Sequence, residues 1–382
     1  MCTEWKTYEL GTLLSYEQPT AYIVESTDYN DNYQTPVLTA GKSFIIGYTN
    51  ETSGIYKSLP VIIFDDFTTS SQYVNFLFKV KSSAMKILSP NTELVLPKFI
   101  YYRMQIIQFD HSTHKRYWIQ QYSKIKVKIP PIPEQERIIS KIEELFSKLD
   151  ASVAELQTAK EKLKVYRQAV LKEALEGDYP CVRLKEIATA FSGYAFKSKK
   201  YSSDGRYVVV KIGNVKSFRF DFSRDLTKTS EIDDNILNKY LLKKGDCLIT
   251  MTGSRGKRDY GYVAMVEDQD NYLLNQRVSA LRFDDSVALP KFYKYVLSSP
   301  QYRNQFFSYE TGNVGQGNVG IRALTEPKVI CPTLKTQEAI IQNIEFRLSL
   351  CDSIEQSMDT SLQQAEALRQ SILKQAFEGR LV

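Results

Sequence analysis

Three short segments combine side chains that could bind a nucleic acid. They mix lysines and arginines with hydroxyl, aromatic and glycine residues: "HSTHKRYW" (111–118), "FKSKKY" (196–201) and "TGSRGKRDYGY" (252–262). Cations in such loops contact phosphates, whereas Arg, Asn, Gln, Ser and Thr side chains can hydrogen-bond to base edges. A solvated turn can have the same composition. Because segments of this composition occur in both halves of the chain, we interpret them as binding loops rather than as solvated turns.

Loop composition alone selects the candidate contact residues. In the first half they are Lys42, Tyr48, Thr49, Asn50, His114, Lys115 and Arg116. In the second half they are Lys199, Lys200, Ser254, Arg255, Lys257, Arg258, Tyr260, Gln316 and Asn318.

The charge distribution agrees with this choice. The net charge of +6 comes from +2 in residues 1–130, +8 in 180–331 and −2 in each of 131–179 and 332–382. The excess positive charge therefore lies in the parts that carry the candidate loops, as a nucleic-acid surface requires.

Motifs for catalysis are missing. "IPPIP" (129–133) lacks the amide and the aromatic ring of an adenine methyltransferase loop, and "GNVGQG" (312–317) follows no convincing strand. "FDDF" (64–67) has acids without the lysine of a metal-dependent nuclease. The five scattered cysteines and the pair in "HSTH" (111–114) favour neither a disulfide framework nor a metal site. We predict a chain that is not an enzyme.

An internal repeat organises the sequence. Shifting the chain by 202 residues aligns 135–177 with 337–379 without a gap, and 16 of 43 positions are identical. Both copies end alike, in "RQAVLKEALEG" and "RQSILKQAFEG". Upstream, "LPKFIYY" (96–102) matches "LPKFYKY" (289–295) at a shift of 193. The order is therefore variable, repeated, variable, repeated.

Each repeated segment predicts one long helix. In the first, Ile142, Leu149, Leu156, Leu163 and Val170 recur every seventh residue, with Leu145, Ala159 and Tyr166 between them. In the second, Ile344, Cys351, Met358, Ala365 and Ile372 keep the register, with Ile354 and Leu368 between them. Heptad stripes of this kind pack against a partner helix. At 1.5 Å per residue, each helix is roughly 65 Å long.

The predicted fold class is α+β, with two mixed α/β domains separated by a long antiparallel two-helix coiled coil. The domains are residues 1–130 and 180–331, and the spacer helices occupy 131–179 and 332–382. In each domain we predict one small curved sheet with peripheral helices. Its strands include "LPVIIF" (59–64), "GDCLITMTGS" (245–254) and "SALRF" (279–283).

This arrangement resembles the specificity subunit of type I restriction-modification enzymes over essentially the whole chain. The resemblance rests on "PPIPEQERI" (130–138), "CPTLKTQEAI" (331–340), the "EG" helix ends, "NQRVSALRF" (275–283) and "TGNVGQGNVGIRAL" (311–324). The second helix start has Thr336 before Gln337, where the family pattern has Glu.

The resemblance implies a non-catalytic subunit that reads a bipartite asymmetric DNA site through two target-recognition domains. It implies two methyltransferase subunits, which hold S-adenosylmethionine and methylate adenine, and two restriction subunits, which use ATP and Mg for cleavage. No cofactor or metal is expected in this chain. We expect a cytoplasmic protein without a membrane partner, because the sequence has neither a long apolar run nor a signal peptide.

Two alternatives stay open at this point. A stand-alone enzyme, such as a fused restriction methyltransferase, would bind S-adenosylmethionine itself. A protein-binding coiled-coil scaffold would show no salt-dependent affinity for DNA.

The repeat also predicts how the chain closes on itself. "EWKTYELGTL" (4–13) resembles "DYPCVRLKEI" (178–187), which follows the first helix. We therefore expect the two termini to lie side by side and permuted chains to retain DNA reading. The helices would act as a ruler between half-sites that lie about one turn of DNA apart, roughly 34–36 Å, or somewhat more.

Overall fold

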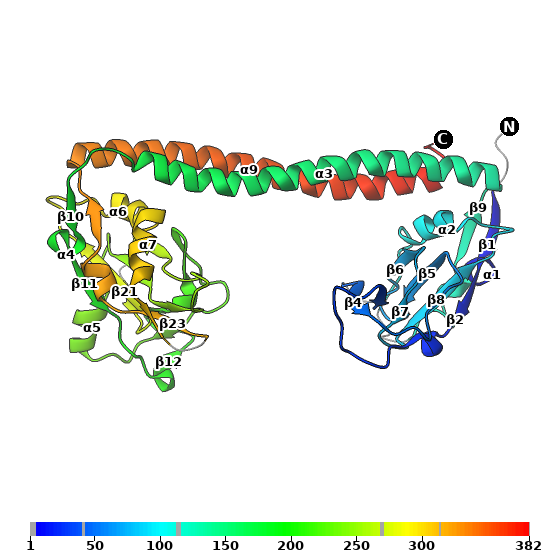
Figure 1. The fold of residues 1–382 in the computed structure, drawn as a ribbon, viewed down its shortest axis with the longest axis horizontal. Coiled ribbons are helices and arrows are strands. Elements are labelled where there is room, and N and C mark those ends of the chain that lie inside the picture. The colour runs from blue at the N-terminus through cyan, green and yellow to red at the C-terminus, as the bar shows by residue number, and fades with distance from the viewer. Residues whose placement is uncertain (1–4, 40–42, 112–115, 268–270, 313–314, 382) are drawn as a thin grey trace. The chain divides into compact units, whose positions relative to one another are not determined.

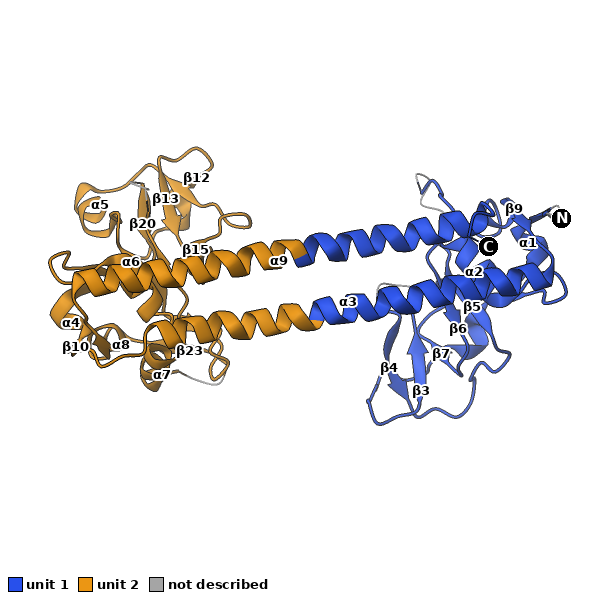
Figure 2. Ribbon diagram, turned by 90° about the horizontal axis from the view of Figure 1, so that it is seen from above, with its two compact units in different colours: residues 1–157, 358–382 blue, residues 158–357 orange. Residues whose placement is uncertain are grey.

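The computed structural model describes residues 5–39, 43–111, 116–267, 271–312 and 315–381. The chain divides into two compact units, unit 1 (residues 1–157 and 358–382) and unit 2 (residues 158–357), as Figure 2 shows. Each unit contains a β-rich domain and part of both long helices, α3 (Ile132–Ala174) and α9 (Leu334–Phe377) (Figure 1). The predicted α+β class is confirmed. The four-part division at 130, 179 and 331 stays a prediction.

The two long helices match the repeated segments in length, with 43 residues in α3 and 44 in α9. Within unit 2, Arg167 of α3 pairs with Asp352 of α9 at 2.7 Å. Further along α3, Glu173 pairs with Arg347 at 2.9 Å. Residue numbers rise along α3 as they fall along α9, so the helices are antiparallel there.

The heptad prediction holds for one set of positions and fails for another. Ile344, Cys351, Ala365 and Ile372 are all buried, as predicted for the seam. The prediction was wrong for Tyr166, Ile354 and Leu368, which are 38–50% exposed. A single partner helix covers only a narrow stripe, so the flanking apolar positions remain in water.

Within its described residues, the domain of unit 1 contains three small sheets rather than the single sheet we predicted. Its strands are β1 (Lys6–Glu9), β2 (Leu14–Glu17), β3 (Thr35–Leu38), β4 (Ile45–Thr49), β5 (Val61–Asp65), β6 (Ser71–Val74), β7 (Lys79–Val80), β8 (Met85–Pro90) and β9 (Lys126–Ile129). Its helices are α1 (Leu10–Leu13), α2 (Pro97–Met104) and two 3-10 turns (Pro19–Tyr22 and Tyr122–Lys124). The strand orders are β2-β8-β5-β6, β4-β3-β7 and β1-β9.

The domain of unit 2 has the same kind of construction with more strands. They are β10 (Cys181–Arg183), β11 (Ala188–Ser192), β12 (Tyr201–Ser202), β13 (Tyr207–Val210), β14 (Val215–Lys216), β15 (Arg219–Phe220), β16 (Lys228–Thr229), β17 (Cys247–Thr250), β18 (Thr252–Gly253), β19 (Val263–Met265), β20 (Tyr272–Leu274), β21 (Val278–Phe283), β22 (Glu310–Thr311), β23 (Gly317–Val319) and β24 (Lys328–Ile330). The helices are α4 (Leu184–Ile187), α5 (Asp234–Tyr240), α6 (Pro290–Val296), α7 (Pro300–Ser308), α8 (Arg322–Thr325) and two 3-10 turns (Ser198–Lys200 and Ile212–Asn214). The strand orders are β11-β21-β17-β19, β12-β16-β13-β20, β18-β23-β22, β14-β15 and β10-β24.

The four-stranded antiparallel sheets β2-β8-β5-β6 and β11-β21-β17-β19 are equivalent in the two units. Strand β5 sends Ile62 and Phe64 into one hydrophobic core and Val61 and Ile63 into another. Strand β17 likewise divides its residues between two cores. Side chains of a strand alternate between its faces, so a strand covered on both sides needs a continuous apolar run. "VIIF" (61–64) and "CLI" (247–249) provide such runs.

The predicted closure of the chain is visible in two ribbons of equal register. Tyr8 lies opposite Val127 in β1-β9, and Val182 lies opposite Val329 in β10-β24. In unit 1 the Phe99 ring contacts both Trp5 and Phe377, at centroid distances of 6.5 and 5.2 Å. The first described residue and the last residue of α9 therefore meet on one side chain, as expected for neighbouring termini.

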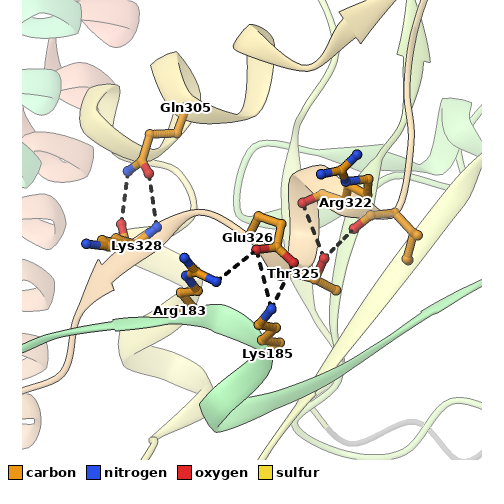
Figure 3. Close-up of polar contacts among 8 residues, drawn as sticks. Arg183, Lys185, Gln305, Arg322, Thr325, Glu326 and Lys328 are labelled. Atoms are coloured by element: carbon orange, nitrogen blue, oxygen red, sulfur yellow. Dashed lines mark hydrogen bonds and ion pairs between the residues drawn. The ribbon is translucent and has the colours of Figure 1, made fainter.

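In unit 2 polar contacts hold the β10-β24 ribbon (Figure 3). Glu326 accepts hydrogen bonds from Lys185 at 3.0 Å and from Arg183 at 3.5 Å. Gln305 of α7 donates to the backbone oxygen of Lys328 and accepts from its N–H, at 2.9 and 3.0 Å. Gln305 thus satisfies backbone groups on the open side of β24, where an edge strand would otherwise expose them.

Candidate nucleic-acid interface

In unit 2, four chain segments meet at one end of the four-stranded sheet. They are residues 192–194, 251–255, 275–277 and 316–319, which we call the polar edge. Gln276 N–H donates to the Tyr194 carbonyl at 3.0 Å, and Met251 N–H donates to the Arg277 carbonyl at 3.1 Å. Val319 N–H donates in turn to the Met251 carbonyl at 2.9 Å. Backbone hydrogen bonds thus fix all four segments against one another.

Glycine permits the closest approach within the polar edge. A Cβ atom at Gly193 would lie only 2.2 Å from the backbone oxygen of Asn275. Any side chain there would separate the 192–194 and 275–277 segments. Glycine is therefore required by close packing of two backbones.

The loop of residues 252–262 is held by partners that come late in the sequence. The Tyr260 hydroxyl donates to Glu310 Oε1 at 2.7 Å. The guanidinium of Arg303 donates to the carbonyls of Gly261, Arg258 and Tyr260 at 2.7–3.1 Å. These bonds give the loop one defined conformation before any ligand arrives.

The predicted contact residues of this loop fall into two groups. Tyr260 is 1% exposed, and burial raises the pKa of its phenol, so in this structure the residue supports the loop. Arg255 donates to the Gly312 carbonyl at 2.7 Å, and Arg258 donates to Asn304 Oδ1 at 2.9 Å. The exposed residues Lys257 and Gln316, together with the half-buried Ser254 and Asn318, complete the set that the structure brings together.

Two residues of the polar edge were missed by the sequence reasoning. Gln276 and Arg277 lie in the turn between β20 and β21, and both are exposed. Their backbone is fixed, while no described residue pairs with the Arg277 guanidinium. The sequence carries a signal for both residues, because they belong to "NQRVSALRF" (275–283), one of the segments on which the family resemblance rests.

Lys199 and Lys200 lie next to this edge along the chain, in the 3-10 turn Ser198–Lys200. The turn borders a cavity of about 130 Å³. The cavity is lined by Tyr194, Phe196, Lys197, Lys200, Tyr201, Thr229, Glu231, Ile232, Asp233 and Ile236. Lys200 and Glu231 lie 4.0 Å apart at its rim, and both are exposed.

The candidates of unit 1 are less concentrated. Lys42, His114 and Lys115 lie outside the described residues. Thr49 is buried at the end of β4, where its hydroxyl accepts the Glu51 N–H at 3.2 Å. Tyr48 is half-buried, whereas Asn50 and Arg116 are exposed. Within the described residues, no hydrogen bond or ion pair joins Tyr48, Thr49 or Asn50 to Arg116.

The described part of the chain contains no group of three or more His, Cys, Asp or Glu side chains that could hold a metal ion. Within the same residues, every helix is too short or too polar to cross a bilayer.

The fold and the sequence define the class of this protein. Residues 176–359 match the family model of the type I restriction modification DNA specificity domain. Together with the duplicated domains and the paired helices α3 and α9, this match places the chain in the family of type I restriction-modification specificity subunits.

Particular relatives follow from sequence comparison. The chain is 43% identical over 202 residues to the EcoR124I/EcoR124II specificity subunit of Escherichia coli, covering 50% of this chain and 49% of that protein. It is 26% identical over 278 residues to the EcoKI specificity subunit of Escherichia coli strain K12, covering 68% and 58%. The matches thus span about half of the first relative and less than two thirds of the second.

Solved structures share the fold. The HsdS subunit from Thermoanaerobacter tengcongensis superposes with a TM-score of 0.54 at 15% identity, covering 100% of this chain and 98% of that one. A chain from work on complex assembly and conformational transition of the type I R-M system gives a TM-score of 0.71 at 16% identity, covering 99% and 98%.

Proposed function

We propose that this chain is the DNA-reading subunit of a type I restriction-modification complex and that its two domains each read one half of a bipartite asymmetric site. The observation that carries the proposal is the duplicated four-stranded sheet, which in unit 2 ends in an edge of exposed polar and cationic side chains. Two similar domains with different loop sequences suit two different half-sites.

The reading surface of unit 2 would be the polar edge. Lys257 suits a phosphate, whereas Arg277, Gln276 and Asn318 suit base edges in a groove. Arg255 and Arg258 hold the loop through the protein contacts described above, and both keep exposed surface for a phosphate. In unit 1 the corresponding proposal rests on Tyr48, Asn50 and Arg116, with Lys42, His114 and Lys115 as predicted contacts.

Catalysis would belong to partners. Two methyltransferase subunits would supply S-adenosylmethionine and methylate adenine, and two restriction subunits would supply ATP-driven cleavage with Mg. The exposed apolar side chains of Phe346, Leu350 and Ile354 recur every fourth residue of α9, which suits packing against partner helices. We place the complex in the cytoplasm, where its DNA substrate is.

Helix length would set the distance between the half-sites. Helices of 43 and 44 residues are roughly 65 Å long. Inserting or deleting residues in both helices should therefore change the spacer of the recognised site, whereas exchanging one domain should change one half-site.

Methylation mapping tests the proposal. The chain is co-expressed with its cognate methyltransferase subunit in a host without adenine methylation, and methylated adenines are located by sequencing. We expect a single bipartite motif. Methylation of no such motif would count against the proposal.

A scaffold that binds only proteins is distinguished by salt. For a DNA-reading complex, affinity for DNA should fall steeply between 50 and 200 mM salt, because each neutralised phosphate releases counterions. Salt-independent or absent binding, with the methyltransferase subunit present, would favour the scaffold.

A further inference from the structure

Each long helix starts with a fully buried glutamine, Gln135 in α3 and Gln337 in α9. In unit 1 the Gln135 side-chain oxygen accepts the Leu96 N–H at 2.8 Å. Its side-chain nitrogen donates to the carbonyls of Leu94 at 3.0 Å and Pro130 at 2.8 Å. Both amide protons and the amide oxygen are therefore used.

The same three bonds occur in unit 2. Gln337 accepts the Leu289 N–H at 2.8 Å and donates to the carbonyls of Val287 and Pro332, both at 2.8 Å. The partners are equivalent positions, because Leu96 and Leu289 each open an "LPKF" segment. We call each set of three bonds a glutamine clamp.

The clamp joins three parts of a unit. Leu94 and Leu96 lie in the connection that leads from strand β8 to helix α2. Pro130 lies in the turn between β9 and α3, and Gln135 is in the first turns of α3 itself. The amide thus connects the sheet, its flanking helix and the long helix at one point.

A second contact fixes each domain further along its long helix. Lys98 of α2 pairs with Glu143 of α3 at 2.5 Å. In unit 2 Lys291 of α6 pairs with Glu345 of α9 at 2.7 Å. In each unit this glutamate is eight residues after the glutamine, which corresponds to about 12 Å along a helix.

Tyrosine hydroxyls complete this second contact. Tyr102 donates to Glu143 at 3.5 Å and Tyr295 donates to Glu345 at 3.3 Å. Burial, with the Glu143 charge, raises the pKa of Tyr102 to about 12, so its hydroxyl remains a donor at neutral pH. Two separated contacts determine an angle, whereas one would allow rotation.

Apolar packing supplies attachment but little angular preference. Ile138 and Ile142 share a core with Phe99 of α2, and Ile340 and Ile344 share one with Phe292 of α6. Burial of apolar area is non-directional, whereas hydrogen bonds weaken steeply when their angle changes. The clamp therefore contributes what the core cannot.

We propose that Gln135 and Gln337 are positioning residues, which fix the angle of each recognition domain on its long helix and so the spacing at which the half-sites are read. This inference rests on the proposed function. A domain without these hydrogen bonds would tilt on its long helix. Its DNA-contacting residues would then face base pairs one position closer to the other half-site or one position further from it.

The test replaces each amide by a side chain of similar length, in Gln135→Met and Gln337→Met, in the full chain with its methyltransferase subunit. Methylation is measured on DNA duplexes that carry the mapped half-sites with the native spacer, or with one base pair more or less. We expect the preference for the native spacer to fall by about tenfold, the effect of one to two lost net hydrogen bonds.

Controls separate positioning from stability. Gln342→Met alters an exposed glutamine of α9 and should leave the spacer preference unchanged. If a clamp variant does not fold, Lys98→Met and Lys291→Met remove the second contact at partly exposed side chains and should relax the preference less.

Each outcome decides a different point. Relaxed spacing supports the inference. An equal loss of methylation at all spacers, or an unchanged preference, overturns it, because a role in stability alone predicts one of these results. Failure of the unaltered chain to methylate any bipartite motif would instead refute the proposed function.

Discussion

The two β-rich domains share a four-stranded sheet and differ in the elements that surround it. Both have an antiparallel four-stranded sheet that is preceded by a short helix, α1 in unit 1 and α4 in unit 2. In both, the "LPKF" segment begins a helix after the sheet, α2 after strand β8 and α6 after strand β21. Unit 2 adds helix α7 and the β18-β23-β22 sheet, which supports the polar edge. Phe306 of α7 shares a hydrophobic core with Ile340 and Ile344 of α9, so the added helix also helps to attach the domain of unit 2 to its long helix.

This contrast separates a repeated frame, common to both units, from loops that differ between them. Residues that occur in both copies of the repeat, such as the clamp glutamines, attach each domain to its long helix through equivalent hydrogen bonds. The loops between the repeated elements do not attach a domain to its long helix, because their hydrogen bonds join residues of the same domain. A loop can therefore change while the domain stays attached.

The largest expected effect is on unit 2 alone, in Asp246→Ala. Asp246 is 1% exposed, and its carboxylate accepts bonds from Arg282 at 2.6 and 2.7 Å and from the Lys243 N–H at 2.8 Å. Arg282 keeps 39% of its side chain exposed, so the main loss is that of the charge-assisted hydrogen bonds to a buried carboxylate, which should lower the free energy of unfolding by about 3 kcal/mol. Differential scanning calorimetry should show a lower melting temperature for the transition that contains unit 2.

Asp234→Ala is the matched control, because this exposed aspartate lies in the first turn of α5. A shift of equal size in both variants would contradict the assigned role of Asp246.

The second prediction concerns discrimination between the half-sites. Arg277→Ala should relax the motif at one base pair of one half-site by about 1–3 kcal/mol, the value of a good bidentate arginine contact. The other half-site should not change. Methylation mapping of the variant measures this, and relaxation in both half-sites would show that the edge does not read bases directly.

A smaller effect is expected where the chain begins in unit 1. Trp5 donates its indole N–H to Glu134 at 3.0 Å, at a place where unit 2 has a continuous chain between α3 and β10. Trp5→Phe should cost about 1 kcal/mol of unfolding free energy. Thermal unfolding of the linear chain gives the value.

The same substitution in a permuted chain sharpens the result. If residues 381 and 5 are joined by a short linker and new ends are opened near residue 178, strand β1 is held covalently. The cost of Trp5→Phe should then be smaller, and an undiminished cost would show that the bond does not act as a tether.

The smallest effect is a pH dependence in unit 1. Lys79 bonds to Glu51 at 2.6 Å and lowers the pKa of this carboxyl, and the N–H groups of Ser26 and Glu25 add to the shift. A depressed pKa stabilises the folded state above the unfolded value of about 4.3, and the contribution is lost as pH falls through the lower folded value. The melting-temperature gap between the unaltered chain and Glu51→Gln should therefore shrink below about pH 4.3. A constant gap from pH 7 to 3 would rule out this titration.

The starts of the long helices could be predicted to within two residues, whereas both helices end five residues before the predicted segments do. Their repeat and the glycine and proline residues at their ends are local signals that need no tertiary information. The strands "VIIF" and "CLIT" were equally readable as buried runs. The number of sheets was not, because the pairing of β12, β13, β16 and β20 joins segments up to about 70 residues apart.

The candidate site was predictable only as a set of loops. Tyr260 looks like a contact residue in "KRDYGY", yet it is buried against Glu310, which lies 50 residues later. Arg277 was passed over because its turn has no cluster of cations. Whether a polar side chain is exposed or paired depends on distant residues.

By itself the sequence determined the repeated frame of this protein, namely two long helices, two domains and an order of segments that brings the two termini together. Helix formation and periodic burial depend on neighbours within a few residues, so the sequence expresses them directly. Only the tertiary structure decided which loop residues meet in the polar edge and which polar groups, such as the clamp amides, hold the domains. Those contacts join residues far apart in the chain, and hydrogen bonds between them exist only in the folded geometry.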